Sequence, residues 1–220
     1  MHSADYARIL GQYAHDCVFC SADEALVLTD GDRFGVLFDP SPLVAGHLII
    51  YSREHYACAG EVPRAEVAEL DRLRLDITQL VRDRFGAATL YEHGRAGHCL
   101  SDGPEHRLCH HFHLHVVPGD IDVSDRLCGR FDQVALARYS DITDVYEQYG
   151  DYLYLETDDG HQRYFVVNQP IERHLMRTLI SKRIGQPERA SWRDHADRAL
   201  LVEGMAAIRR NETGLAAVGR

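Results

Sequence analysis

The stretch His111-Phe112-His113-Leu114-His115-Val116-Val117, followed by Pro118 and Gly119, decides the fold of this chain. Imidazoles alternate with apolar side chains from His111 onward, and such a period of two predicts a β-strand. Because alternate side chains of a strand share a face, the three histidines point to one side and the apolar residues into the core. Three imidazoles on one face can bind a metal ion or an anion, or transfer a proton or a phosphoryl group.

Histidines are concentrated around this strand. Seven of the 14 in the chain lie between His93 and His115. The alternative is a solvent-facing strand whose many histidines have no functional role, and the strict alternation disfavours it. We therefore expect this region to carry the chemistry of the protein.

Short strands and one long helix surround the histidine-rich strand. Residues 25–29 and 34–38 are apolar runs separated by Asp30-Gly31-Asp32, which predicts a hairpin. The helix starts at Pro63, shows apolar residues mostly three or four apart, and ends at Gly86. The other strands that we expect before residue 120 cover residues 47–52, 87–91 and 110–117, with a polar loop at 95–107.

The second half of the chain has weaker patterns. Residues 121–150 are read as a loop with a short helix, and Asp158-Asp159-Gly160 lies between two short apolar runs, which predicts another hairpin. The remaining expected elements are strands at 152–156 and 163–167, helices at 171–184 and 194–210, and a frayed tail at 211–220. The whole pattern predicts an α+β fold, in which an antiparallel sheet with a long crossover helix carries a C-terminal hairpin-and-helix extension.

Composition limits the classes of function. The 220 residues are 45% hydrophobic and 26% charged, which is enough for a folded core. The net charge of −10 disfavours general nucleic-acid binding, which needs clustered Lys and Arg, but leaves small anionic substrates open. No apolar run is long enough to span a membrane, and the N-terminus lacks the pattern of a signal peptide. We expect a cytoplasmic protein whose six cysteines are reduced.

The motif Cys17-Val18-Phe19-Cys20 raises the question of a metal. Two thiolates separated by two residues can share a tetrahedral zinc ion, with two further ligands from elsewhere. Redox pairs share this spacing, but here the motif precedes a hairpin and does not open a helix of a βαβ unit, which disfavours thioredoxin-like chemistry. Zinc binding is the preferred interpretation of this motif.

Together these motifs resemble the histidine-triad (HIT) superfamily of nucleotide hydrolases and transferases, in its bacterial zinc-containing type. The resemblance rests on the three alternating histidines with their proline, and on the Cys17–Cys20 motif before them. It also includes residues 38–42 and 46–50 with His55, and Glu92-His93-Gly94, all in the family's order. It covers roughly the first half of the chain and implies a nucleotide-binding domain at 1–120 and an extension at 121–220 packed on it.

The resemblance implies a role for each matching residue. His113 is the nucleophile, and His115 donates hydrogen bonds to phosphate oxygens. Asp39 binds the ribose hydroxyls, because a carboxylate accepts two hydrogen bonds from a diol; a plain turn residue beside Pro40 is the alternative. The further implied residues are Val18 and Phe19 at the base, Gly94 and Arg107 at the phosphates, and Cys17, Cys20, His55 and His111 as zinc ligands.

The implied activity is attack on the α-phosphate of a small nucleotide conjugate through a covalent nucleotidyl-His113 intermediate. Dinucleoside polyphosphates and nucleoside phosphoramidates are the expected substrates, and a homodimer with a continued sheet is the expected assembly. Three alternatives stay open. The first is a phosphorylase or transferase with phosphate or a sugar phosphate as acceptor. The second is a nucleotide sensor with little turnover, and the third is an interaction module in which the triad serves only the metal.

Overall fold

The computed structural model describes residues 1–13, 17–96 and 111–210. The helices and strands are α1 (Ser3–Tyr13), β1 (Val27–Asp30), β2 (Phe34–Phe38), β3 (Leu48–Ser52), η1 (Ala59–Glu61), α2 (Arg64–Phe85), β4 (Ala88–Glu92), β5 (His113–Pro118), α3 (Ser124–Leu127), β6 (Asp132–Ala135), η2 (Tyr139–Asp141), α4 (Ile142–Tyr149), β7 (Tyr152–Glu156), β8 (Gln162–Val166), α5 (Leu175–Arg183), η3 (Pro187–Ala190) and α6 (Arg198–Arg209). Within those described ranges, no helix combines the length and the apolar character that crossing a bilayer requires.

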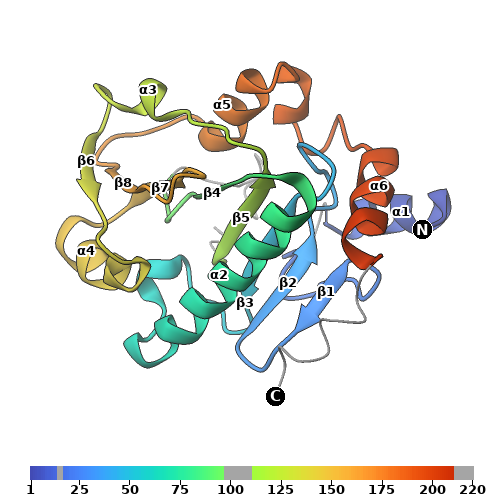
Figure 1. The fold of residues 1–220 in the computed structure, drawn as a ribbon, viewed down its shortest axis with the longest axis horizontal. Helices are drawn as coiled ribbons and strands as arrows, with labels where there is room; N and C mark the ends of the chain where they lie inside the picture. Colours follow the sequence, from blue (N-terminus) through green and yellow to red (C-terminus); the bar gives the residue numbers. More distant parts are fainter. Residues whose placement is uncertain (14–16, 97–110, 211–220) are drawn as a thin grey trace, which may run out of the picture.

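One antiparallel sheet organises the molecule (Figure 1). Its eight strands lie in the order β1-β2-β3-β5-β4-β7-β8-β6, and each neighbouring pair is antiparallel. The helices lie outside the sheet, and α2 crosses the strands in Figure 1. The expected α+β fold, with its crossover helix and its C-terminal hairpin and helices, is therefore confirmed.

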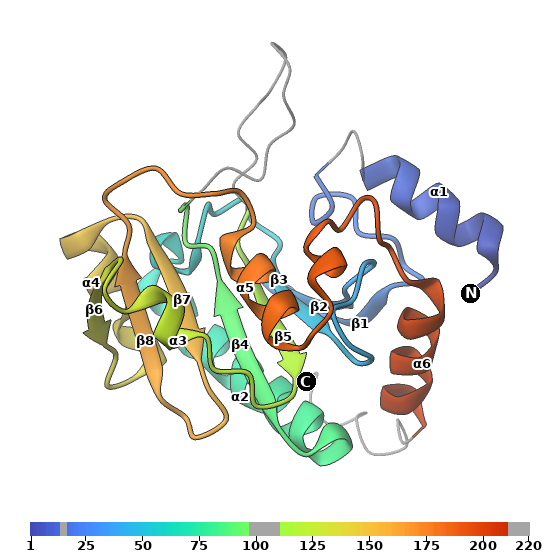
Figure 2. The ribbon, with the colours of Figure 1, turned by 90° about the horizontal axis from the view of Figure 1, so that it is seen from above.

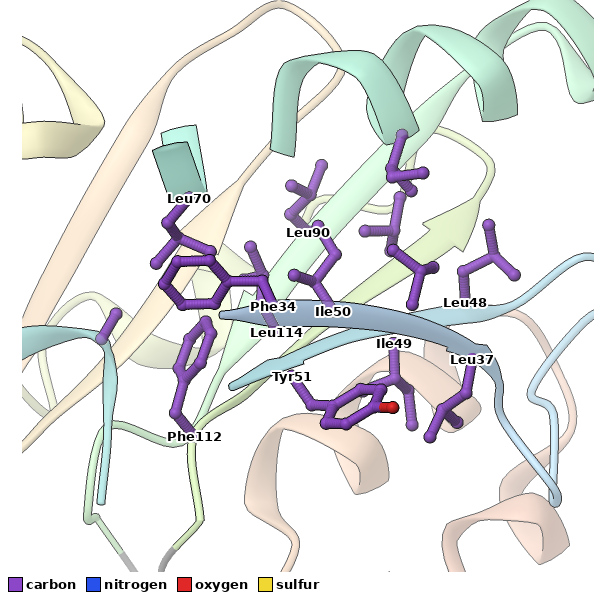
Figure 3. Close-up of a cluster of buried hydrophobic side chains, with 14 of the residues drawn as sticks. Phe34, Leu37, Leu48, Ile49, Ile50, Tyr51, Leu70, Leu90, Phe112 and Leu114 are labelled. Carbon is purple, nitrogen blue, oxygen red and sulfur yellow. The ribbon is translucent and has the colours of Figure 1, made fainter. Parts of the chain in front are cut away.

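Helix α2 covers the face of the sheet opposite the histidines. Its apolar stripe, which includes buried Leu70, packs over Ile50, Leu90 and Leu114 in one core cluster (Figure 3). The helix ends where expected, because Gly86 has φ 89°, a conformation that glycine adopts without strain. Burial of this stripe fixes which side of β5 faces inward and therefore which side presents the imidazoles.

The second half of the chain extends the same sheet. Strand β7 pairs with β4, and β8 and β6 follow it, so that the β7–β8 hairpin continues the sheet beyond residue 120 (Figure 2). The sequence pattern missed β6, because this edge strand is mostly exposed and has Val134 and Ala135 as its apolar residues. It also missed α1, which lies near α6 and β1 at the far end of the molecule (Figures 1 and 2).

Candidate functional site

Strand β5 brings His113 and His115 into one row on the face of the sheet opposite α2. Antiparallel pairing with β3 sets Tyr51 opposite His113, and pairing with β4 sets Tyr91 opposite His115. Residues paired in register share a face, so the two tyrosines flank the imidazoles. Gly35 makes room for the Tyr51 ring, because a Cβ atom there would lie 2.6 Å from it.

His113 is held with one ring nitrogen available for attack. Its Nδ1 lies 2.7 Å from the carbonyl oxygen of His111, and since a carbonyl only accepts, Nδ1 carries the proton and donates it. The lone pair is then on Nε2. Burial lowers the pKa of His113, which favours the neutral, nucleophilic imidazole at neutral pH. The ring of Phe19 stacks on His113 with centroids 4.7 Å apart.

His115 is connected to a fourth histidine, His47, which lies at the start of a predicted strand and had no predicted role. His47 Nε2 lies 3.0 Å from His115 Nδ1, and the backbone N–H of Leu43 donates to His47 Nδ1 at 3.2 Å. Tyr91 stacks almost parallel on His115, with an interplanar angle of 8°. Burial lowers the pKa of His47 to about 4 and that of His115 well below its usual value, so both rings are neutral at pH 7.

Asp39 lies beside this histidine pair and is 4% exposed. Its Oδ1 accepts from the Ser41 backbone N–H at 2.7 Å, and its Oδ2 accepts from Arg177 at 3.3 Å. The same Oδ2 lies 3.4 Å from His47 Nδ1, so protein groups surround most of the carboxylate. Asp39, His47 and His115 also lie close enough to share a cation. The Arg177 guanidinium occupies the same carboxylate oxygen, however, and its charge disfavours a metal there.

The structure brings Cys17, Cys20, His55 and His111 together. Their ligand atoms all lie within 4.8 Å of one another, and His111 Nδ1 is 3.5 Å from each sulfur. Zn–S and Zn–N bonds of about 2.3 and 2.0 Å at tetrahedral angles give an S···N separation of about 3.5 Å. Two thiols and two imidazoles are also the donor set of structural zinc sites. The residues present therefore fit a zinc ion.

His111 links this cluster to the nucleophile. Its Nε2 donates to the Ser52 carbonyl oxygen at 2.7 Å, which leaves Nδ1 free of a proton and directed at the two sulfurs. Such a second hydrogen bond commonly fixes the orientation of a metal-binding histidine. The His111 carbonyl oxygen is in turn the acceptor that orients His113. One residue thus contributes both to the cluster of possible metal ligands and to the orientation of His113.

The resemblance implies that Glu92 and His93 belong to a loop beside the phosphates. In the structure, Glu92 lies away from the histidine row. Glu92 is 2% exposed and alternates with Tyr91, so it points to the face opposite the histidines, where Ala59 N–H and Tyr152 donate to it. His93 accepts from the backbone N–H of Met176 at the start of α5. Gly94 packs on Tyr152, whose ring would lie 2.1 Å from an added Cβ atom.

Glu92 makes stability depend on pH. Burial raises the pKa of its carboxyl to about 8. The folded chain therefore holds a proton between about pH 4.5 and 8 that the unfolded chain releases, so stability falls as pH rises through that window. In the wild type we expect the free energy of unfolding to fall by on the order of a few kcal/mol between pH 5 and pH 8, and in Glu92→Gln we expect this fall to be absent. Urea unfolding of both proteins at the two pH values measures it, and equal losses in both would contradict the assignment.

The remaining expected site residues lie as follows. Val18 is half-buried and packs against the main core cluster, next to Phe19. Arg107 falls outside the described residues. The main additions to the sequence analysis are His47, Tyr91 and Arg177. No local pattern marks Arg177, because it reaches Asp39 from 138 residues away.

The fold and site define an antiparallel α+β protein with a row of histidines, and histidine-triad proteins are among the solved structures that it resembles. The yeast Ap4A phosphorylase aligns at 14% identity and TM-score 0.44, covering 70% of this chain and 66% of the enzyme. A hypothetical histidine triad nucleotide-binding protein from Sulfolobus tokodaii aligns at 18% and 0.36, over 62% of this chain and 98% of that one. A Hit-like protein from Bartonella henselae aligns at 15% and 0.33, over 42% and 65%.

These similarities are distant. The chain spans about two thirds of the length of the yeast and Bartonella proteins. No protein-family model and no curated protein sequence matches it. Because the identities and TM-scores are low, we take the function from the geometry of the site.

Proposed function

We propose that this chain is a histidine-triad enzyme, a nucleotidyl hydrolase or transferase that acts on small nucleotide conjugates. The observation that carries the proposal is the hydrogen bond from His113 Nδ1 to the His111 carbonyl oxygen, which leaves Nε2 unprotonated on a face shared with His115. A nucleophile with one nitrogen tied to an acceptor and the other available is the arrangement that covalent catalysis needs. A sensor or a zinc-braced module has no use for it.

In the proposed reaction, His113 Nε2 attacks the α-phosphorus in line with the leaving group. The N–P bond forms while the bond from phosphorus to the leaving group breaks, and the leaving group departs with the bonding electrons. Water, or phosphate in a phosphorylase, then attacks the phosphorus while the N–P bond breaks, which releases the nucleotide and restores His113. The proton that water loses passes to solvent, and the leaving group takes one from solvent. His115 donates a hydrogen bond to the phosphate oxygens as charge develops in both steps.

Substrate contacts follow from the same surroundings. Asp39 is proposed to accept hydrogen bonds from the ribose hydroxyls, and Phe19, whose ring stacks on His113, is proposed to contact the base together with Val18. Gly94 and Arg107 remain the proposed phosphate-side residues. Phosphate and water are alternative acceptors for one nucleotidyl intermediate, so hydrolase and phosphorylase differ only in the second half of the reaction.

Zinc, assembly and location complete the proposal. We assign a structural zinc ion to Cys17, Cys20, His55 and His111, with no part in bond making. Cys17, Cys20, Cys58 and Cys128 form no disulfide with one another, which is compatible with metal binding by the first two. A homodimer with a continued sheet would form through β1 or β6, the two strands at the sheet's edges. We keep 1–120 as the nucleotide-binding domain and 121–220 as its extension.

The test is turnover of a panel of adenosine and guanosine conjugates, with products identified by mass spectrometry. We expect a nucleoside monophosphate in water and, if the enzyme is a phosphorylase, a nucleoside diphosphate when inorganic phosphate is added. The best substrate identifies the class of leaving group. Tight nucleotide binding without turnover of any conjugate would reject the enzyme and favour the sensor.

A further inference from the structure

Two arginines of the C-terminal region hold the loop between Asp39 and His47. Arg177 of α5 donates to the Ser41 carbonyl oxygen at 2.5 Å, and Arg189 of η3 donates to the Leu43 carbonyl oxygen at 2.8 Å. Arg177 Nε also donates to the Arg189 carbonyl oxygen at 3.0 Å, which ties the two together. Arg177 is 5% exposed, so its charge is held inside the protein by these acceptors and by Asp39.

The loop held in this way determines where two histidines carry their protons. The Leu43 backbone N–H can only donate, so His47 Nδ1 accepts and His47 carries its proton on Nε2. That proton is donated to His115 Nδ1, 3.0 Å away. His115, which is neutral, must then carry its own proton on Nε2, the nitrogen that is not turned toward His47.

A second arrangement of protons competes with this one. Asp39 Oδ2 lies 3.4 Å from His47 Nδ1, so a proton on Nδ1 could be donated to the carboxylate. His47 Nε2 would then accept from His115 Nδ1, and His115 Nε2 would have no proton to offer. Arg177 disfavours this arrangement, because its guanidinium already donates to Asp39 Oδ2 at 3.3 Å. The choice therefore depends on the Leu43 amide staying at His47 and Arg177 staying at Asp39.

We infer that Arg177 and Arg189 are positioning residues that keep the proton of His115 on Nε2, through the Leu43 amide and His47. This gives the C-terminal region a function at the site: it prepares His115 as a hydrogen-bond donor. The value of that donor for catalysis rests on the proposed function, in which His115 Nε2 meets the phosphate oxygens. The proton positions themselves do not depend on turnover.

The experiment is long-range ¹H–¹⁵N NMR of the full chain labelled with ¹⁵N-histidine, which separates the two neutral tautomers by their nitrogen shifts. Peaks are assigned with His47→Gln and His115→Gln. We expect His47 and His115 both protonated on Nε2 in the wild-type protein. In Arg189→Gln, and more strongly in Arg177→Gln/Arg189→Gln, we expect a measurable fraction of both rings protonated on Nδ1, and Arg189→Lys should restore most of the wild-type state.

Arg183→Gln is the matched control, because Arg183 lies on the same helix, is exposed and pairs with Asp125. It should leave both tautomers unchanged. Where the double variant does not fold, Arg189→Gln alone decides, since this side chain is partly exposed. His47 protonated on Nδ1 in the wild type, or wild-type tautomers in folded Arg189→Gln, would overturn the inference. In turnover assays Arg189→Gln should lower kcat about tenfold with little change in KM.

Discussion

His113→Ala is expected to lower kcat by at least about 10⁴-fold. The reason is that His113 has an unprotonated Nε2 that is oriented through the His111 carbonyl oxygen, whereas the unprotonated nitrogen of His111 faces the two cysteine sulfurs. The neighbouring His115 has its Nδ1 engaged with His47 and cannot take over the attack. Initial rates with the best conjugate of the panel measure the effect.

The control for this prediction is His161→Ala. His161 is exposed in the turn between β7 and β8 and pairs with Asp159, without a contact to the histidine row. We expect its kcat to stay within about twofold of the wild type, as for most surface changes. A His113→Ala enzyme that keeps a tenth of the wild-type rate would show that the nucleophile is another group.

Removal of the metal cluster is expected to have the largest effect on stability. In Cys17→Ser and Cys20→Ser we expect loss of about one equivalent of zinc and a free energy of unfolding lower by about 3 kcal/mol or more. The physical reason is that four ligands from three separate segments converge at one point, so metal binding ties those segments together. Elemental analysis and thermal unfolding, with and without a chelator, measure both quantities.

Two controls separate this effect from a general one. Cys128→Ser alters an exposed thiol that is not part of the cluster and should leave zinc content and unfolding unchanged. His113→Ala should also keep its zinc, whereas His111→Ala should lose it, because the His111 ring, unlike that of His113, faces the two sulfurs. Zinc loss in His113→Ala would favour an interaction module in which the triad serves the metal.

Local patterns were enough to predict most of the fold. The alternation through His113 and His115 required a strand with one apolar side, and the apolar stripe of α2 required a helix over that side. Strand β6 was not predicted, because an exposed edge strand needs few apolar residues and its position is set by pairing with β8. Periodicity reports burial, so elements that are little buried leave little trace in it.

The site was predictable only where neighbours in sequence are neighbours in space. His113 and the His111 carbonyl that orients it are two residues apart, although the sequence did not identify that acceptor. The proposed zinc cluster brings His111 together with Cys17 and Cys20, which lie 94 and 91 positions before it in the sequence. Only a resemblance to a known family connected these residues. Arg177 is neither close to Asp39 in sequence nor part of the resemblance, so its role was not predicted. Its contact with Asp39 depends on how α5 packs across the sheet. Likewise, nothing in the sequence indicated that Glu92 faces away from the histidines.

The most direct test of the account is the mass of the tryptic peptide that contains residues 111–118 after the protein meets a nucleotide conjugate. The reaction is stopped within milliseconds and kept alkaline, because a phosphorus–nitrogen bond to histidine hydrolyses in acid. The account predicts a nucleoside monophosphate attached to His113, absent from His113→Ala and absent after the substrate is exhausted. An adduct on another residue, or full turnover with no adduct at any time, would contradict it.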